Sequence, residues 1–169
     1  MCFHHVYEEH SDAAKQQKCE HALALDRNLA FAHFRIGLAK LFTGRVEETE
    51  NHVLEALRLS PRDRSGYIAM FIAGAAKLYL GRDEEATTWL LRSVETNRNI
   101  ASLHFYLAAA RAHLGTLNEA RAATKAGLEL DPTFTIRRFR AGASSDNPTY
   151  LAQRERVYDG MRKAGVPEE

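Results

Sequence analysis

One nine-residue segment occurs three times in the sequence, and its first copy reads Ile36-Gly37-Leu38-Ala39-Lys40-Leu41-Phe42-Thr43-Gly44. Near-copies occupy residues 73–81 and 107–115, and each copy ends in glycine. Each copy is followed by a polar turn and a second amphipathic run. That run ends in a similar short segment each time, and residues 56–61 are the first example. A glycine between two amphipathic runs is typical of a helical hairpin. The sequence therefore predicts an all-α repeat protein.

The composition indicates a soluble globular protein of 169 residues, 45% apolar and 27% charged, with a formal charge of +1. Such a balance provides no strong field to recruit nucleic acid or an anionic membrane. Only Cys2 and Cys19 are present, and no apolar leader follows Met1. The longest uncharged apolar stretch, residues 68–76, is far shorter than the roughly 20 residues that span a bilayer. We therefore expect a cytoplasmic protein that does not enter membranes.

The spacing of the repeated segment divides the chain into three parts. Residues 1–28 are predicted to be an incomplete N-terminal repeat, with Ser11 as the N-cap of its helix. Three complete repeats follow in residues 30–134, and Gly81 and Gly115 lie 34 residues apart (115 − 81). Residues 135–169 are predicted to form C-terminal capping helices.

The last of these helices is expected over residues 149–164, after an N-cap at Asn147 and proline at the first helical position. Its apolar side chains lie on one side, as a helix that covers the exposed end of an array requires. They are Tyr150, Leu151, Val157, Tyr158 and Met161.

Together these features resemble the tetratricopeptide repeat family, whose period is 34 residues. The resemblance implies antiparallel helical hairpins stacked in a right-handed α-α superhelix, with small residues where the helices cross. The eighth position of the three repeats is Gly37, Gly74 and Ala108. The twentieth is Thr49, Ala86 and Ala120, and the twenty-seventh is Ala56, Ser93 and Gly127. Two positions depart from the family pattern. The usual aromatic at the fourth is His33, Met70 and His104, and the usual tyrosine at the eleventh is Lys40, Lys77 and Arg111.

In that family the first helix of each repeat lines a concave face, and the resemblance implies that ligands are contacted there. The corresponding residues are Phe34, Leu38, Phe42, Phe71, Ala75, Tyr79, Phe105, Ala109 and His113. We expect an aromatic groove that holds an amphipathic helix or an extended apolar peptide. The alternative is that these rings only pack on neighbouring helices or under the terminal helix. Some members of the family clamp the C-terminal carboxylate of a chaperone with Lys and Asn at several of these positions. None of these residues is present at those positions here, so that function is rejected.

No catalytic constellation is visible. The pairs Glu47-Glu48 and Glu84-Glu85 fall in the first turn of second helices, where the helix dipole favours negative charge. No phosphate-binding loop, nucleophile elbow or HExxH motif occurs. The spacing of an N-terminal cluster does not match a closed zinc site; it comprises Cys2, His4, His5, His10, Cys19 and His21. We therefore expect a protein that is not an enzyme and has no metal or cofactor.

The C-terminal part is rich in basic residues, which are Arg137, Arg138, Arg140, Arg154, Arg156, Arg162 and Lys163. Acidic residues interrupt this series, and aromatic residues do not alternate with it as on a nucleic-acid platform. A solvated helix face is the favoured interpretation, and nucleic-acid binding is the least favoured function.

Residues 146–153 and 160–168 sharpen the family resemblance further. With the repeats, they look like the C-terminal region of bacterial, especially rhizobial, adenylate/guanylate cyclase proteins, in which a cyclase domain precedes the repeats. The resemblance implies a regulatory module of a larger signalling protein. Our first hypothesis is a non-catalytic module for protein–protein interaction or self-association, with homodimerisation through the incomplete N-terminal repeat. The alternative is the substrate-presenting repeat region of another enzyme, such as a transferase.

Overall fold

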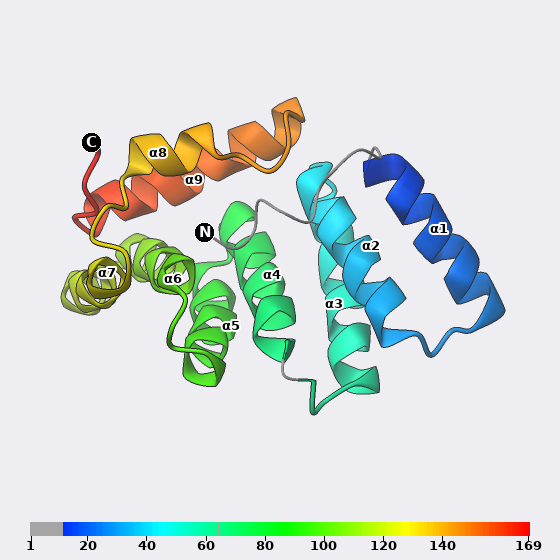
Figure 1. Ribbon diagram of the computed structural model, residues 1–169. Helices are drawn as coiled ribbons and strands as arrows, with labels where there is room; N and C mark the ends of the chain where they lie inside the picture. The colour runs from blue at the N-terminus through cyan, green and yellow to red at the C-terminus, as the bar shows by residue number, and fades with distance from the viewer. Residues whose placement is uncertain (1–11, 64) are drawn as a thin grey trace.

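A computed structural model describes residues 12–63 and 65–169 (Figure 1). The predicted N-cap Ser11 and the N-terminal candidates Cys2, His4, His5 and His10 lie outside this range. The described residues form helices and no strand. The helices are α1 (Asp12–Leu25), α2 (Ala30–Phe42), α3 (Val46–Leu59), α4 (Gly66–Tyr79), α5 (Asp83–Thr96), α6 (Ala101–His113), α7 (Leu117–Leu130), α8 (Ile136–Ala141) and α9 (Pro148–Lys163).

The helices from α2 to α7 form three hairpins stacked in a row (Figure 1). Within each hairpin the first helix packs along the second, and each second helix packs on the first helix of the next hairpin. Helix α1 packs on α2 at the start of the row. The predicted all-α hairpin architecture is confirmed, while the division at residues 28, 30 and 134 stays a prediction.

Small residues permit the close helix crossings, as the sequence pattern indicates. A Cβ atom added to Gly74 of α4 would lie only 2.6 Å from the Cγ atom of Leu90 in α5. Real side chains do not tolerate such a separation, so only glycine keeps these two helices at their present distance. The glycine that closes the same helix, Gly81, has φ +74°, a conformation that costs other residues more than glycine.

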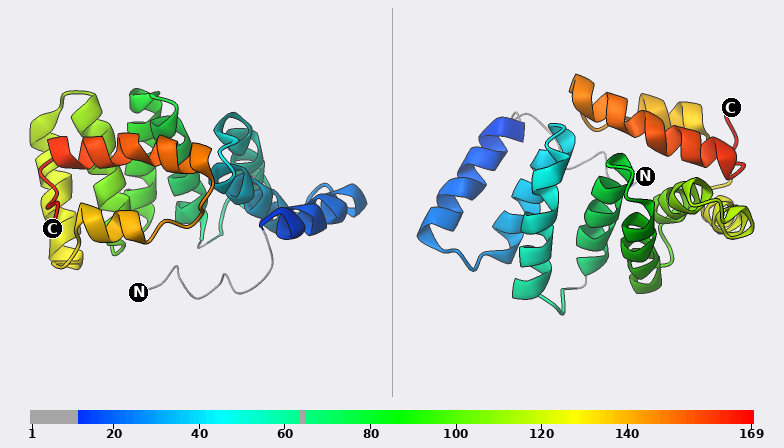
Figure 2. Two further views of the ribbon diagram at one scale, coloured as in Figure 1. Left: turned by 90° about the horizontal axis from the view of Figure 1, so that it is seen from above. Right: turned by 180° about the vertical axis from the view of Figure 1, so that it is seen from behind.

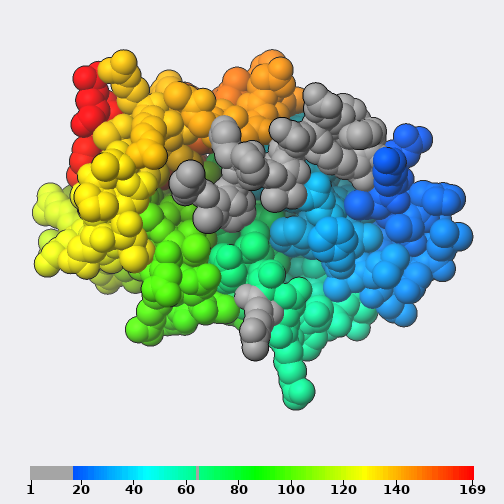
Figure 3. All heavy atoms as spheres, viewed as in Figure 1, coloured from blue at the N-terminus to red at the C-terminus, as the bar shows by residue number. Residues whose placement is uncertain are grey.

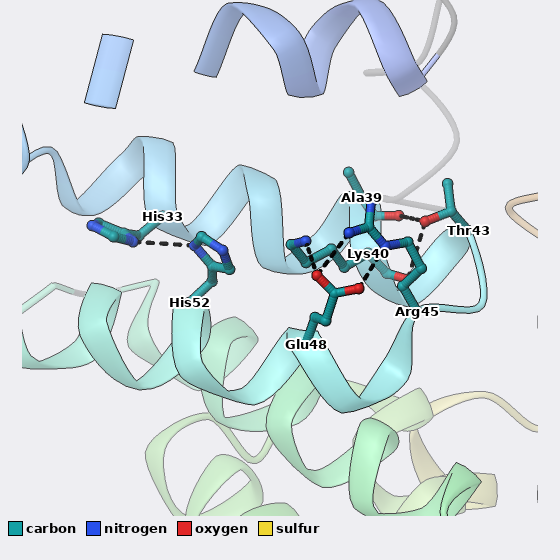
Figure 4. A network of polar contacts seen from close by, with 7 residues as sticks. All are labelled: His33, Ala39, Lys40, Thr43, Arg45, Glu48 and His52. Carbon is teal, nitrogen blue, oxygen red and sulfur yellow. Dashed lines mark hydrogen bonds and ion pairs between the residues drawn. The ribbon is translucent and has the colours of Figure 1, made fainter. Parts of the chain in front are cut away.

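The basic residues at the eleventh position have a structural role that explains their departure from the family pattern. Each one forms an ion pair with a glutamate eight residues later, in the second helix of its own hairpin. The N···O distances are 2.6 Å for Lys40–Glu48, 2.9 Å for Lys77–Glu85 and 3.3 Å for Arg111–Glu119. Figure 4 shows the first of these pairs, where Arg45 also binds Glu48. An ion pair across each hairpin thus stands where the family usually has tyrosine.

The C-terminal helices turn back over the array rather than continuing it. Helix α9 lies across α6 and also contacts α4, as both views in Figure 2 show. The chain end is tied to α8, because the backbone N–H groups of Ile136 and Arg137 donate to the carbonyls of Pro167 and Glu168. In Figure 3 the orange residues lie along the upper edge of the molecule, on the side away from the green turns at its lower edge.

Helix α9 therefore does more than cover the last repeat. Its first turn reaches the first repeat, where the ring of Tyr150 meets Phe42 edge to face at a centroid distance of 5.5 Å. Near its end, a Cβ atom added to Gly160 would lie 2.7 Å from the carbonyl oxygen of Ala109 in α6. The helix thus contacts α6, α4 and the C-terminal end of α2.

Candidate functional site

Helix α9 lies on the concave positions that the sequence singles out. Tyr79 faces Tyr150 at a ring distance of 6.2 Å, and its hydroxyl lies 3.3 Å from that of Tyr106. His113 donates from Nε2 to the carbonyl oxygen of Arg156 at 2.9 Å. Ala109 and the residues around it are completely buried. The structure thus gathers Phe42, Tyr79, Ala109 and His113 under one helix.

The other predicted groove residues lie away from α9 or at the edges of its contact with the repeats. Phe105 is fully buried and stacks on Phe134 at 3.8 Å, so it belongs to the core between the third repeat and α8. Phe71 meets Tyr106 edge to face at 4.7 Å. Ala75 is buried, while Phe34 and Leu38 are half-buried in the first repeat. That any of the nine residues contacts a partner stays a prediction.

Arg154 of α9 lies buried where this helix packs on the rest of the chain. Arg154 is only 2% exposed, and its guanidinium lies 4.4 Å above the ring of Phe139, with the rings of Tyr150 and Tyr158 within 5.5 Å. It donates to the Tyr150 hydroxyl at 3.0 Å and to the Phe139 carbonyl at 3.1 Å, while its Nε has no acceptor. Among the described residues, no carboxylate pairs with it. The contact therefore buries a positive charge among aromatic rings.

Polar contacts hold the edge of α9. Arg156 pairs with Asp83 at the start of α5 at 2.5 Å, and both side chains are at least two-thirds buried. Gln153 donates from Nε2 to the carbonyl of Gly44 at 3.4 Å. One oxygen of Asp83 and the Nε of Arg156 have no partner and are buried. These polar contacts therefore orient α9 on the repeats, but some of the buried polar atoms along its edge have no hydrogen-bond partner.

Burial changes the acidity of the tyrosines beneath α9. It raises the pKa of Tyr106 to about 12 and that of Tyr79 well above its ordinary value of 10. The pKa of Tyr158 is also raised, mainly by burial. All three hydroxyls are therefore neutral throughout the physiological range, and the cluster acts as a set of apolar rings with hydrogen-bonding ends.

A second feature, an open pocket, lies at the junction of the first and second repeats. It has a volume of about 300 Å³ and lies between α2, α3 and the start of α4. Phe34, Leu57 and Ile68 contribute to its wall, and Phe31 beside them is 72% exposed. Of the nine predicted groove residues, only Phe34 lines this pocket.

Sequence reasoning missed the residues that hold α9 in place. It assigned Arg154 and Arg156 to a solvated basic face, and this assignment is wrong, because Arg154 is buried and Arg156 pairs with Asp83. The other ion pairs of this region are Arg137–Glu169, Arg140–Glu155, Arg162–Glu168 and Lys163–Asp159. One signal was available: Tyr150, Arg154 and Tyr158 recur every four residues and so lie on one helix face.

Three further observations concern the residues that the structure describes. None of the helices found in 12–63 and 65–169 has both the length and the apolar character needed to cross a membrane. Over the same ranges, no three metal-ligating side chains come together. The thiol of Cys19 is free and half-buried.

The geometry defines a class of fold, an array of tetratricopeptide-type helical hairpins with a C-terminal helix laid across it. Solved structures share it. One is described as "MamA RS-1 ArsTM double mutant", with a TM-score of 0.68, 17% identity, and coverage of 92% of this chain and 88% of that one. MamA residues 41 to the end, from Desulfovibrio magneticus RS-1, give 0.68 and 17%, covering 92% and 89%.

A third similar structure is YrrB, described as a TPR protein with an unusual peptide-binding site. Its TM-score is 0.63 at 23% identity, covering 91% of this chain and 78% of that one. No protein-family model and no curated protein matches the sequence. At these identities the comparisons establish the tetratricopeptide fold and leave the function to the site itself. They provide no support for the cyclase resemblance.

Proposed function

We propose that this chain is a non-catalytic protein-interaction module whose concave face binds an amphipathic helix of a partner. The observation that carries the proposal is the docking of α9 itself: Tyr150 and Gly160 of this helix lie against Phe42, Tyr79 and Ala109 of the concave face. A surface shaped to take one helix from its own chain has the rings, small residues and hydrogen-bonding groups that a second helix needs.

The chemistry of α9 argues that its docking is reversible. Burying a charge without a carboxylate partner costs free energy that rings and two hydrogen bonds only partly offset. Arg154 imposes this cost, and the unpaired buried atoms of Asp83 and Arg156 add to it. A helix with a better-matched side chain at the place of Arg154 would therefore compete with α9. In this proposal α9 occupies the groove in the absence of a partner, and the partner helix displaces it.

Six of the nine predicted groove residues enter the proposal, in two groups. Phe42, Tyr79, Ala109 and His113 would contact the central part of the partner helix, where α9 now lies. Phe34 and Leu38 would contact its end, beyond the reach of Tyr150. The peptide-binding site described for YrrB, which has a similar fold, is in keeping with this use of the array.

The wider setting is also part of the proposal. The family resemblance of the sequence suggests the regulatory region of a larger, cytoplasmic bacterial signalling protein, such as a nucleotide cyclase. Self-association through the incomplete N-terminal repeat is supported by three exposed apolar side chains, Leu25, Leu29 and Phe31, near the turn between α1 and α2. No observation favours substrate presentation for a transferase over this assignment.

The proposal is tested by offering the groove a helix from outside. A labelled peptide with the sequence of residues 148–163 is titrated into the full chain and into its Gly160→Leu variant, in which the added side chain cannot fit against Ala109. In the unchanged chain the tethered α9 outcompetes the peptide through its high effective concentration. In the variant the groove is open, and we expect the labelled peptide to bind saturably, as measured by fluorescence anisotropy.

Two controls define the outcome. The same peptide with Gly160→Leu should not bind, because it has the same clash with α6. Adding Tyr79→Ala to the variant chain should weaken binding of the unchanged peptide, because a ring contact with Tyr150 is lost. If the variant keeps its helical content by circular dichroism and yet binds no peptide, α9 is a permanent structural cover and the proposal is wrong.

A further inference from the structure

Two histidines of the first repeat lie against each other across the hairpin. The Nδ1 atom of His33 in α2 is 3.2 Å from the Nδ1 atom of His52 in α3, and the ring centroids are 5.4 Å apart (Figure 4). The second ring nitrogen of His33, Nε2, lies 3.2 Å from the carbonyl oxygen of Arg27. Both side chains are half-buried, so the pair is reachable from solvent.

These contacts fix the tautomer of one ring. A carbonyl oxygen only accepts hydrogen bonds, so Nε2 of His33 carries a proton. In the neutral ring Nδ1 of His33 is then unprotonated, and its lone pair points toward His52. Histidines that ligate metals typically donate their second ring N–H to a carbonyl or a carboxylate, which orients the ligating nitrogen. His33 already has this arrangement without a metal.

We propose that His33 and His52 form a two-histidine site for a divalent transition-metal ion of the class that prefers imidazole, such as Zn²⁺. Two nitrogens, each 2.0–2.1 Å from a tetrahedral zinc ion, lie about 3.3 Å apart. The observed separation of 3.2 Å therefore needs no backbone movement. His52 shifts its ring proton from Nδ1 to Nε2, each ring turns slightly toward the ion, and water completes the coordination.

The repeat itself provides a comparison that separates ligation from packing. His104 occupies the same place in the third repeat as His33 does in the first, and its Nε2 contacts the carbonyl of Arg98 at 2.9 Å. This histidine–carbonyl contact is therefore a shared structural feature. The position equivalent to His52 in the third repeat is Ala123, 71 residues on (123 − 52), as His104 is from His33 (104 − 33). Only the first repeat therefore places a second imidazole opposite the first.

The charges around the pair permit a cation. Burial lowers the pKa of His52, as do the positive charge of Lys40 and the neighbouring His33. The carboxylates of Glu20 on α1 and Glu48 on α3 act on His52 in the opposite direction and favour a bound cation. Lys40 opposes the cation, but its Nζ is paired with Glu48 at 2.6 Å.

The test is thermal unfolding of the full chain, followed by circular dichroism, with EDTA and then with increasing Zn²⁺. At free zinc about 100-fold above the dissociation constant, a native-state site should raise the Tm by roughly 5–10 °C. His52→Ala, which introduces the residue of the third repeat, should abolish this rise. His104→Ala should keep it. Every variant retains the N-terminal histidines, so zinc captured there contributes equally to all.

A second measurement on the unchanged chain keeps the proposal testable if His52→Ala folds poorly. Long-range ¹H–¹⁵N spectra of the histidine rings should show Zn²⁺ shifting Nδ1 of both His33 and His52, while Nε2 of His33 remains protonated. An equal rise in Tm for His52→Ala and the unchanged chain would overturn the assignment. So would ring shifts confined to other histidines, or no zinc effect on the unchanged chain.

Discussion

The Nζ atom of Lys77 lies 2.5 Å from Oε2 of Glu50, although the two residues belong to successive repeats. Lys77 is only 1% exposed, and it also pairs with Glu85 of its own hairpin at 2.9 Å. One buried ammonium group thus joins α3, α4 and α5. The ion pairs of Lys40 and Arg111 remain within their own hairpins, so this contact distinguishes the junction between the first and second repeats.

Substitutions at Lys77 should separate packing from charge. Lys77→Ala removes a buried stem as well as the charge and should destabilise the chain by about 3 kcal/mol in urea unfolding. Lys77→Met keeps the volume and leaves two carboxylates that can reach water, so its cost should be below about 1.5 kcal/mol. Lys125→Ala, at an 81% exposed side chain, is the control and should change stability by less than about 0.5 kcal/mol. Equal costs for the Ala and Met variants would contradict this account.

Enlarging Gly160 should lift α9 from the array. A leucine there meets the backbone of Ala109, and we expect a loss of about 3 kcal/mol together with faster amide hydrogen exchange throughout α9. Gly142→Ala is the matched control, because its added Cβ would be no closer than 3.7 Å to other atoms and its φ is −89°. Unchanged exchange in α9 of the Leu variant would show that the helix can shift without leaving α6.

The ion pair between Asp83 and Arg156 should couple α9 to the second repeat. In a double-mutant cycle with Asp83→Asn and Arg156→Gln, we expect a coupling free energy of about 1 kcal/mol, since both groups are largely buried. The coupling should decrease as salt is added. The exposed pair Arg137–Glu169 is the control and should give less than about 0.5 kcal/mol. Coupling no larger than this control would mean that the pair does not hold α9.

Alkaline pH should destabilise the tyrosine cluster. Burial raises the folded-state pKa of Tyr79, Tyr106 and Tyr158 above the ordinary value of 10, so the folded chain keeps protons that the unfolded chain releases. Their contribution to stability is complete below pH 10 and declines as the pH rises from 10 toward 12. Phenolate absorbance during a pH titration should show these tyrosines ionising together with unfolding. Ionisation of every tyrosine near pH 10 in the folded chain would contradict the prediction.

Features that depend on neighbouring residues could be predicted from the sequence. Gly44, Gly81 and Gly115 mark the helix ends, and each adopts a positive φ. Gly74 was predicted to be a helix contact and lies against Leu90. These outcomes follow from local chemistry, because the need for a left-handed turn or a close crossing recurs at the same place in every repeat.

The site was only partly predictable, because its contacts join distant parts of the chain. Phe42 and Tyr79 were identified as concave residues, but nothing in their surroundings indicates that Tyr150 covers both. The burial of Arg154 was missed because basic residues usually remain in water. The pairing of His33 with His52 was also missed, although their places in the repeat put them on facing helices.

The row of helical hairpins, the 34-residue spacing of the second and third repeats and the polar start of the last helix could all be predicted from the amino-acid sequence, because each hairpin depends on short-range patterns of glycine, apolar residues and caps. The packing of α9 back along the first helices of the repeats, over several of the predicted groove residues, becomes visible only in the folded chain. The physical reason is that the docking of α9 depends on contacts between residues as far apart as Gly44 and Gln153, whose combined free energy no local pattern encodes.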